Sequence, residues 1–494
     1  MPAVKLPHAL KPKSPAKRRA SKTTDDDFFG KYKPDPHQVI SLKHAEAQPR
    51  VLDFSDAGTG KTPAALWDFA RRRRNGGKAA LVICPKTLMT NVWASSVRKF
   101  APYLTVSSAK AENRAEAFAV DADIYVTNTD AAAWLAKQNK KFFDRFDTLI
   151  NDESSAFKHH TSQRSKALAK IRKHFEYRRL MSGTPMSLSI CDVWHQAFIV
   201  DDGQRLGHRF YAFRNSVCTP KQVGANANAL KWTDKEGAED AVFGLLSDIV
   251  VRHKFDDVVK IPERQVYTMP FTMTSKHAKA YYQMEKQQFV AYQDKKAKGA
   301  VTAIHAASVR GKLLQIASGA VYADRIDDND KPTLVVDTSR YELAMDLATE
   351  SPHTLMMFLW KHQRDQLVAE AEKRNLNYAV LDGGASSALR ESIEAQYQAG
   401  KYDVLIAHPK TVAHGLTLTL GTTTIWVSPT DDTEWFKQGN RRQARRGQTK
   451  GTRVITLIAE GTVDQAAYDN CVGKGTREDV FLELFERYQA EEMA

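Results

Sequence analysis

At 494 residues, the chain is too long for one hydrophobic core of ordinary size, so two or three domains are expected. Its hydrophobic content of 42% and charged content of 26% are ordinary for a globular protein, and no apolar run reaches the roughly 18 residues of a membrane span. The N-terminus has no apolar segment typical of a secretory signal. The four cysteines have no CxxC spacing, which favours reduced thiols in a cytosolic or nuclear protein over a disulfide or zinc framework.

The net charge of +14 is unevenly distributed along the chain. Residues 1–24 contain seven Lys or Arg and no acidic residue, in a segment rich in Pro, Ser and Ala. Such a composition cannot bury a core, so we predict that residues 1–27 form a disordered basic tail. The tail is either a solubilising arm or a non-specific nucleic-acid-binding arm. The second is slightly favoured because the rest of the chain is also basic.

Short apolar runs alternate with helical patterns in two separate parts of the chain. In the first part, strands are expected at 51–54, 81–84, 124–126 and 148–150. In the second part, they are expected at 355–359, 378–381, 404–406, 424–427 and 454–458. This alternation is typical of parallel sheets covered by helices.

The domain organisation follows from these two parts. We predict a first α/β lobe at 28–262 with an insertion near 200–262, a helical section at 263–335 and a second α/β lobe at 336–475. An amphipathic C-terminal helix is expected at 476–494.

A glycine-rich loop follows the first predicted strand and precedes a helix. Gly58, Thr59, Gly60, Lys61 and Thr62 match the end of a phosphate-binding loop, whose backbone N–H groups and helix N-terminus cradle phosphates. Lys61 is expected to reach the β- and γ-phosphates, and Thr62 to ligate Mg²⁺. The strict motif fails at one position, where Ser55 replaces the usual first glycine; Asp56 follows it in the loop.

An acidic pair ends the predicted strand at 148–150. Asp152 is expected to hold Mg²⁺, and Glu153 to orient or deprotonate the attacking water. An acidic pair alone is a weak signal because such pairs also cap helices. Its position after the phosphate loop makes it informative.

The third motif lies at 438–448, in the second lobe. Arg442 and Arg445 are three residues apart, so on a helix they would share one face. Planar guanidinium groups suit the charge that develops in phosphoryl transfer, which makes these two residues candidate arginine fingers. The alternative is a solvated basic helix or a plain DNA-contact patch.

With these motifs, the chain resembles a superfamily 2 helicase, and within that group a Swi/Snf-type DNA-dependent ATPase of the compact kind found in bacteriophages. Further segments match the family in order, including 36–38, 84–88, 127–129, 182–185, 252–254, 381–383 and 413–418. The resemblance implies two tandem RecA-like lobes with an intervening helical protrusion. Two departures stand out: Ser154 and Ser155 follow the acidic pair where many relatives carry Ala-His, and Thr417 replaces a common Asn.

The resemblance also implies roles for individual residues. ATP and Mg²⁺ would bind between the lobes, with catalytic roles for Lys61, Asp152, Glu153, Arg442, Arg445 and Gln438. Nucleotide contacts would come from Gln38, Asp56, Gly58, Thr59, Gly60, Lys61, Thr62 and Gly415. Coupling to DNA and contact with it would come from Ser182, Thr184, Lys86, Thr87 and Lys410.

From these features we expect an ATP-dependent DNA helicase or translocase acting in replication, recombination or repair. We expect it to be a monomer, in the cytoplasm of a bacterial host if a phage encodes it, with DNA and replication or repair proteins as partners. Three alternatives stay open: a duplex-tracking remodeller without strand separation, a non-catalytic DNA-binding scaffold, and an RNA-remodelling enzyme.

Overall fold

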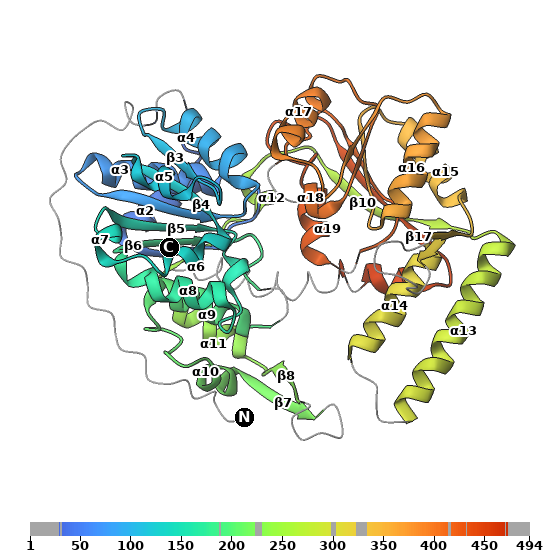
Figure 1. Cartoon of the computed structure of the whole chain (residues 1–494), viewed down its shortest axis with the longest axis horizontal. Coiled ribbons are helices and arrows are strands. Elements are labelled where there is room, and N and C mark those ends of the chain that lie inside the picture. The colour runs from blue at the N-terminus through green and yellow to red at the C-terminus, as the bar shows by residue number, and fades with distance from the viewer. Residues whose placement is uncertain are drawn as a thin grey trace. The chain divides into compact units, whose positions relative to one another are not determined.

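The computed structural model describes residues 29, 32–186, 189–222, 230–297, 303–322, 333–412, 416–430, 432–469 and 471–472. The chain divides into two compact units (Figure 1): unit 1 is Met1–Val259 with Thr476–Ala494, and unit 2 is Lys260–Gly475. The predicted basic tail at 1–27 and the predicted C-terminal helix at 476–494 lie outside the described residues.

Unit 1 is built on a seven-stranded sheet in the order β3-β4-β2-β5-β6-β1-β9, in which every recorded pairing is parallel. Its strands are β1 (Arg50–Asp53), β2 (Ala79–Cys84), β3 (Val106–Ala109), β4 (Ile124–Asn128), β5 (Phe146–Asp152), β6 (Tyr177–Met181) and β9 (Val250–Val251). The four strands predicted from apolar runs are confirmed as β1, β2, β4 and β5.

Helices cover both faces of this sheet (Figure 1). Along β2, Val82 packs with α3 (Lys61–Arg74) and α4 (Ser95–Phe100). The neighbouring Leu81 and Ile83 pack with α8 (Gln163–Ile171), α9 (Cys191–Asp201) and α11 (Ala238–Leu246). Because successive side chains of a strand point to opposite faces, a continuous apolar run is what a strand buried on both sides requires.

Strand β6 was not expected because its sequence carries two arginines. Both are buried: Arg178 forms an ion pair with Asp202 at 2.9 Å, and Arg179 pairs with Asp53 at 3.1 Å. Burial of these charges is tolerated because each is paired and hydrogen-bonded. A hydropathy pattern cannot reveal a partner that is distant in the sequence.

The segment 200–262, predicted as an insertion, contains several elements. Helix α10 (Phe210–Val217) precedes an antiparallel hairpin of β7 (Cys218–Gln222) and β8 (Leu230–Asp234), which extends from the unit in Figure 1. Helix α11 then contributes Val242 and Phe243 to the unit 1 core, and β9 pairs with β1 in the main sheet. Part of this segment therefore completes the lobe.

Unit 2 contains a six-stranded sheet in the order β10-β17-β16-β13-β15-β14, again with parallel pairings throughout. Its strands are β10 (Arg264–Phe271), β13 (Thr354–Met357), β14 (Tyr378–Leu381), β15 (Val404–Ala407), β16 (Thr423–Trp426) and β17 (Thr452–Ala459). Helices α15 (Ser339–Thr349) and α16 (Lys361–Lys373) pack on one face, and α17 (Ser387–Gln398) and α18 (Pro409–Val412) on the other. The predicted fold class, with two parallel α/β lobes, is confirmed.

A helical section separates β10 from β13 in the sequence. The predicted section at 263–335 also included β10, which instead pairs with β17 in the unit 2 sheet. The helical section consists of α13 (Ser275–Ala297) and α14 (Ala303–Ala317), followed by a small antiparallel pair, β11 (Ala320–Tyr322) and β12 (Thr333–Val335). Tyr281 of α13 packs with Leu313 and Ile316 of α14 in a core of their own. No helix among the described residues is long and apolar enough to cross a membrane.

The remaining helices are mostly short. They are α2 (Pro36–Ala47), α5 (Arg114–Ala119), α6 (Ala132–Leu135), α7 (Lys140–Phe143), α12 (Phe255–Val258) and α19 (Thr433–Asn440), with a π-helical turn at Met89–Ala94. The helix predicted at 91–100 is therefore π-helical in its first part.

Unit 2 also contains a buried ion pair. The guanidinium of Arg340 lies 2.6 Å from Asp464, with both side chains almost fully buried, and also donates to the carbonyls of Ala317 and Leu457. We expect Arg340→Met to lower the free energy of unfolding by about 3–5 kcal/mol, because it leaves a buried carboxylate unpaired. Urea denaturation would measure the loss. Lys373→Met, which removes an exposed partner of Glu370, is the control and should cost at most about 1 kcal/mol. Equal losses would contradict this account.

Candidate functional site

Three predicted motifs lie side by side at one edge of the unit 1 sheet. The phosphate loop follows β1, the acidic pair ends β5, and the segment 182–185 follows β6, which lies between β1 and β5. All three strands are parallel, so their carboxyl ends meet at the same edge, where parallel α/β sheets bind ligands.

The loop's shape depends on two glycines. Gly58 has φ of +91° and Gly60, the residue before α3, has φ of +84°. A Cβ at Gly58 would lie 2.8 Å from the ring of Phe255, and one at Gly60 would overlap the amide of Gln38. These positions require glycine for both the backbone conformation and the lack of space.

Helix α2 holds the loop from one side. Its Gln38 donates from Nε2 to the carbonyl of Gly60 at 3.0 Å, and Nε2 of His37 lies 2.7 Å from the carbonyl oxygen of Thr59. Gln38 Oε1 accepts from the backbone N–H of Asp35, which caps the helix. Gln38 therefore supports the loop itself, while its contact with a base stays a prediction.

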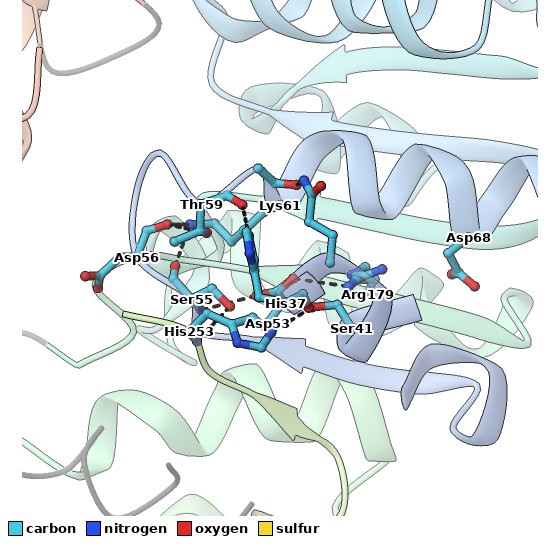
Figure 2. Close-up of polar contacts among 12 residues, drawn as sticks. His37, Ser41, Asp53, Ser55, Asp56, Thr59, Lys61, Asp68, Arg179 and His253 are labelled. Atoms are coloured by element: carbon cyan, nitrogen blue, oxygen red, sulfur yellow. Dashed lines mark hydrogen bonds and ion pairs between the residues drawn. The ribbon is translucent and has the colours of Figure 1, made fainter. Parts of the chain in front are cut away.

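Lys61 lies across its own loop. Its ammonium group donates to the carbonyl oxygens of Ser55 at 2.5 Å and Asp56 at 2.9 Å (Figure 2). Thr59 also donates from its hydroxyl to the Asp56 carbonyl at 2.9 Å. The loop is thus closed around a positive charge at the N-terminus of α3, where partial positive charge from the helix adds to it.

Asp56 is predicted to contact the nucleotide, but its negative charge would repel a phosphate unless another group offset it. Its carboxylate pairs with Arg252 at 2.8 Å and accepts from the backbone N–H of Phe255 at 3.0 Å. Ser55, which stands where the motif usually has glycine, accepts through its hydroxyl from the N–H of His253. Sequence reasoning missed this support of the loop by 252–255; the uncompensated acid at Asp56 was the only available signal.

A buried polar cluster lies beneath the loop (Figure 2). Burial alone would disfavour the charge on Asp53, but Arg179 and Lys61 hold the pKa of its carboxyl below the ordinary value. Burial lowers the pKa of His253 to about 4, so its ring is neutral near pH 7. That ring lies 3.0 Å from the hydroxyl of Ser41, which connects the cluster to α2.

Asp152 and Glu153 lie at the end of β5, as predicted. The indole of Trp93 donates to Asp152 Oδ2 at 2.9 Å, and the N–H of Glu153 donates to Oδ1 at 3.1 Å. Burial and the charge of Glu153 raise the pKa of Asp152 to about 7, although Trp93 and Lys61 oppose the rise. Two adjacent carboxylates in a buried setting form a site that a cation would stabilise.

These residues fit a cation shared with a phosphate better than an all-protein metal site. Among the residues that the structure describes, no group of three or more His, Cys, Asp or Glu could hold a metal ion by itself. The available oxygens come from Asp152 and from Thr62, in the first turn of α3. Few protein ligands suit Mg²⁺, which keeps several waters and takes phosphate oxygens.

The segment 182–185 contacts β1 and the loop. Ser182 donates from its N–H to the carbonyl of Asp53 at 3.0 Å, and its hydroxyl accepts from the N–H of Thr184. A Cβ at Gly183 would lie 3.2 Å from the backbone nitrogen of Ala57. The structure therefore brings Ser182 and Thr184 together with the phosphate loop.

The arginine motif in unit 2 differs from its prediction. Helix α19 ends at Asn440, so Arg442 and Arg445 lie in turns and not on a helix. They still converge, because Leu416 O accepts from Arg442 Nη1 at 3.3 Å and from Arg445 Nη1 at 2.8 Å. Burial lowers the pKa of Arg445, while Glu394 raises it.

The other residues predicted to contact nucleotide or DNA are divided between the two units, and one of them lies outside the residues that the structure describes. Gln438 is on α19 and donates to Glu434 at 2.9 Å. Lys86 is exposed after β2, next to Thr87, and Lys410 is exposed on α18. Gly415 lies outside the described residues. A shared site between the unit 1 motifs and the unit 2 arginines stays a prediction.

Comparisons with known proteins identify a family. A family model described as the SNF2-related domain matches residues 38–316. The chain is 27% identical to protein p41 of Acyrthosiphon pisum secondary endosymbiont phage 1, over 92% of this chain and 99% of the relative. It is 23% identical to the SWI/SNF-related matrix-associated actin-dependent regulator of chromatin subfamily A-like protein 1 of Xenopus tropicalis, over 84% of this chain. The chain spans 41% of that longer relative.

The solved structures that resemble the chain include the Sulfolobus solfataricus SWI2/SNF2 ATPase core in complex with dsDNA. It is 19% identical, with a TM-score of 0.40, over 92% of this chain and 95% of that one. The family model matches more than half of the chain, and the parallel sheets agree with it. The chain belongs to the SNF2-related family, and the resemblance inferred from its motifs is confirmed.

The glycine conformations predict how nucleotide binding responds to substitution. We expect Gly60→Ala to weaken binding of a fluorescent ATP analogue at least about tenfold, the loss of roughly one charge-assisted hydrogen bond, because the loop must move away from Gln38. Gly76→Ala is the matched control. Gly76 has φ of +86° but nothing within 4 Å of a Cβ, so it should show the left-handed strain of about 1–2 kcal/mol without the affinity loss. Equal affinities for the two variants would show that the loop does not bind the nucleotide.

Proposed function

We propose that this chain hydrolyses ATP and uses the energy to move along DNA. The observation that carries the proposal is the convergence of the phosphate loop, the acidic pair and the segment 182–185 at one sheet edge of unit 1. Membership of the SNF2-related family supports the same activity. A scaffold without catalysis is disfavoured because Lys61, Asp152 and Glu153 are all present and held by specific contacts.

The proposal gives each candidate site residue of unit 1 a specific role. The triphosphate would accept hydrogen bonds from the N–H groups of the loop and from Lys61, in exchange for the two carbonyls that Lys61 now contacts. Glu153 would orient the attacking water and accept its proton. The pairing of Asp56 with Arg252 keeps the loop from repelling the phosphates.

Mg²⁺ is the cation that we expect at this site. Asp152 and the hydroxyl of Thr62 would hold it, and when bound it supplies positive charge that offsets the charge developing on the phosphate oxygens. Trp93 holds Asp152 in place through its indole N–H, which fixes the direction of one carboxylate oxygen.

The second unit would supply the remaining charges. Arg442 and Arg445 are proposed to face the phosphates when the two lobes close, with Gln438 beside them. Their shared acceptor, the Leu416 carbonyl, connects them to residues 416–418, part of the 413–418 segment that resembles the family. Lys86, Thr87 and Lys410 are proposed contacts to DNA phosphates.

We propose a monomer that acts in the cytoplasm in replication, recombination or repair. Tracking along a duplex and separation of its strands are alternatives within the same activity. A triplex-displacement assay measures tracking, and a forked-duplex assay measures strand separation, so the two assays run together distinguish them.

The role of Lys61 gives a direct test. We expect Lys61→Ala to reduce DNA-stimulated ATP hydrolysis by about 10²-fold or more, because it removes a positive charge directed at the developing negative charge. DNA affinity should be nearly unchanged, since Lys61 is held within the loop. Phosphate release with and without duplex DNA, beside a DNA-binding titration, measures both. Retained turnover would overturn the assignment of the loop.

The arginine pair gives a second test. We expect Arg445→Ala to slow hydrolysis by about 10³-fold or more while ATP still binds, as the loss of an arginine finger does. Arg446→Ala, at the exposed neighbouring position, is the control and should leave turnover near that of the wild type. If Arg445→Ala instead lowers only DNA affinity, the residue contacts the DNA backbone and not the nucleotide.

A further inference from the structure

Helix α9 holds the segment that directly follows the acidic pair. Asp192 pairs with Lys158 at 3.3 Å, and the Nδ1 atom of His195 lies 2.6 Å from the carbonyl oxygen of Phe157. The hydroxyl of Ser154 donates to Oε1 of Gln196 at 2.6 Å. The backbone leaving Glu153 is therefore fixed against one helix by three polar contacts.

Gln196 also reaches the segment 182–185. Its Nε2 donates to the carbonyl of Pro185 at 2.7 Å and to that of Asp192 at 3.1 Å. Both partners of Nε2 are carbonyl oxygens, which only accept, so the amide has one possible orientation and Oε1 must face Ser154. One side-chain amide therefore bridges the acidic-pair segment and the 182–185 segment.

The bridge is completely buried. Ser154 and Gln196 each have no exposed surface. In such surroundings water does not compete for the hydrogen bonds, and an unmade bond is costly, so the two segments are held in a fixed relation. Relative movement of either segment must displace the amide or carry the other segment with it.

The backbone conformation on each side of the bridge makes Glu153 and Thr184 sensitive to movement of the bridged segments. Glu153 has φ of +55°, a left-handed conformation that is strained for a residue other than glycine, so a shift of Ser154 changes the direction of the Glu153 carboxylate. On the other side, the ring of Pro185 fixes its φ, so rotation about that bond cannot absorb a displacement of the Pro185 carbonyl. The displacement therefore reaches Thr184.

We propose that Gln196 is a positioning residue that couples the catalytic carboxylates to the segment 182–185. The inference rests on the proposed function and names the part of this chain that performs its coupling step. The bond requires a hydroxyl at position 154, where many relatives carry alanine, so the Ser154 departure noted in the sequence acquires a physical role. Gln196 contacts neither nucleotide nor DNA in this account.

The test compares three variants in the full chain. Ser154→Ala removes the hydrogen bond between Ser154 and Gln196. The double variant Ser154→Ala, Gln196→Leu replaces both partners of that hydrogen bond with apolar side chains. Ser165→Ala is the matched control, because the buried Ser165 hydroxyl holds the same segment through the Phe157 carbonyl at 3.0 Å but does not contact 182–185. The measurements are Tm, ATP hydrolysis with and without duplex DNA, and triplex displacement per ATP hydrolysed.

We expect both bridge variants to lose about tenfold in DNA stimulation and to displace less triplex per ATP hydrolysed. Ser165→Ala should lower Tm but retain full DNA stimulation. If the bridge variants keep full stimulation, or if the control loses as much as they do, Gln196 is only a structural residue and the inference fails. A wild-type chain without DNA-stimulated hydrolysis would instead remove the proposed function, and this inference with it.

Discussion

The candidate site of unit 1 depends on one constraint, which is that β1, β6 and β5 run parallel as neighbours in one sheet. A parallel sheet places the carboxyl ends of its strands at the same edge, so motifs that are far apart in the sequence become adjacent in space. Burial of the strands on both faces fixes their register, because a shift would leave backbone groups unpaired within the core. The positions of Lys61, Asp152 and Ser182 follow from this arrangement before any contact between their side chains is considered.

Buried charge is the second theme of the structure, and a counter-charge accompanies it in three cases. Asp53 is paired with Arg179, Asp56 with Arg252, and Arg340 with Asp464. The exception is the pair of like charges at Asp152 and Glu153, where burial and mutual repulsion raise the pKa of Asp152 to about 7. Such a pair is costly unless a cation shares the site, which is why it indicates function and not stability.

Much of this arrangement could be predicted from the sequence, and the failures have physical causes. Apolar runs identified β1, β2 and β5, because strands buried on both faces need uninterrupted hydrophobic residues. The same rule missed β6, whose arginines are paired with distant acids. The phosphate loop and the acidic pair were found because their chemistry depends on neighbours in the sequence.

The supports of the site were harder to predict. Trp93 contacts Asp152, Arg252 contacts Asp56, and Gln196 contacts Ser154. Each partner is distant in the sequence, so no local pattern shows these contacts. The role of the arginine motif stays a prediction, and its expected helix was wrong, because the chain turns after Asn440 and brings both guanidinium groups to a single backbone carbonyl.

The contacts between the phosphate loop and residues 252–255 have a mechanical consequence. Asp56 and Ser55 are hydrogen-bonded to Phe255 and His253, and the chain enters unit 2 at Lys260, only a few residues later. A change in the conformation of this loop would therefore displace the stretch of chain that leads from unit 1 into unit 2. Only residues 256–259 separate these contacts from unit 2, so such a displacement would be transmitted along a short stretch of backbone.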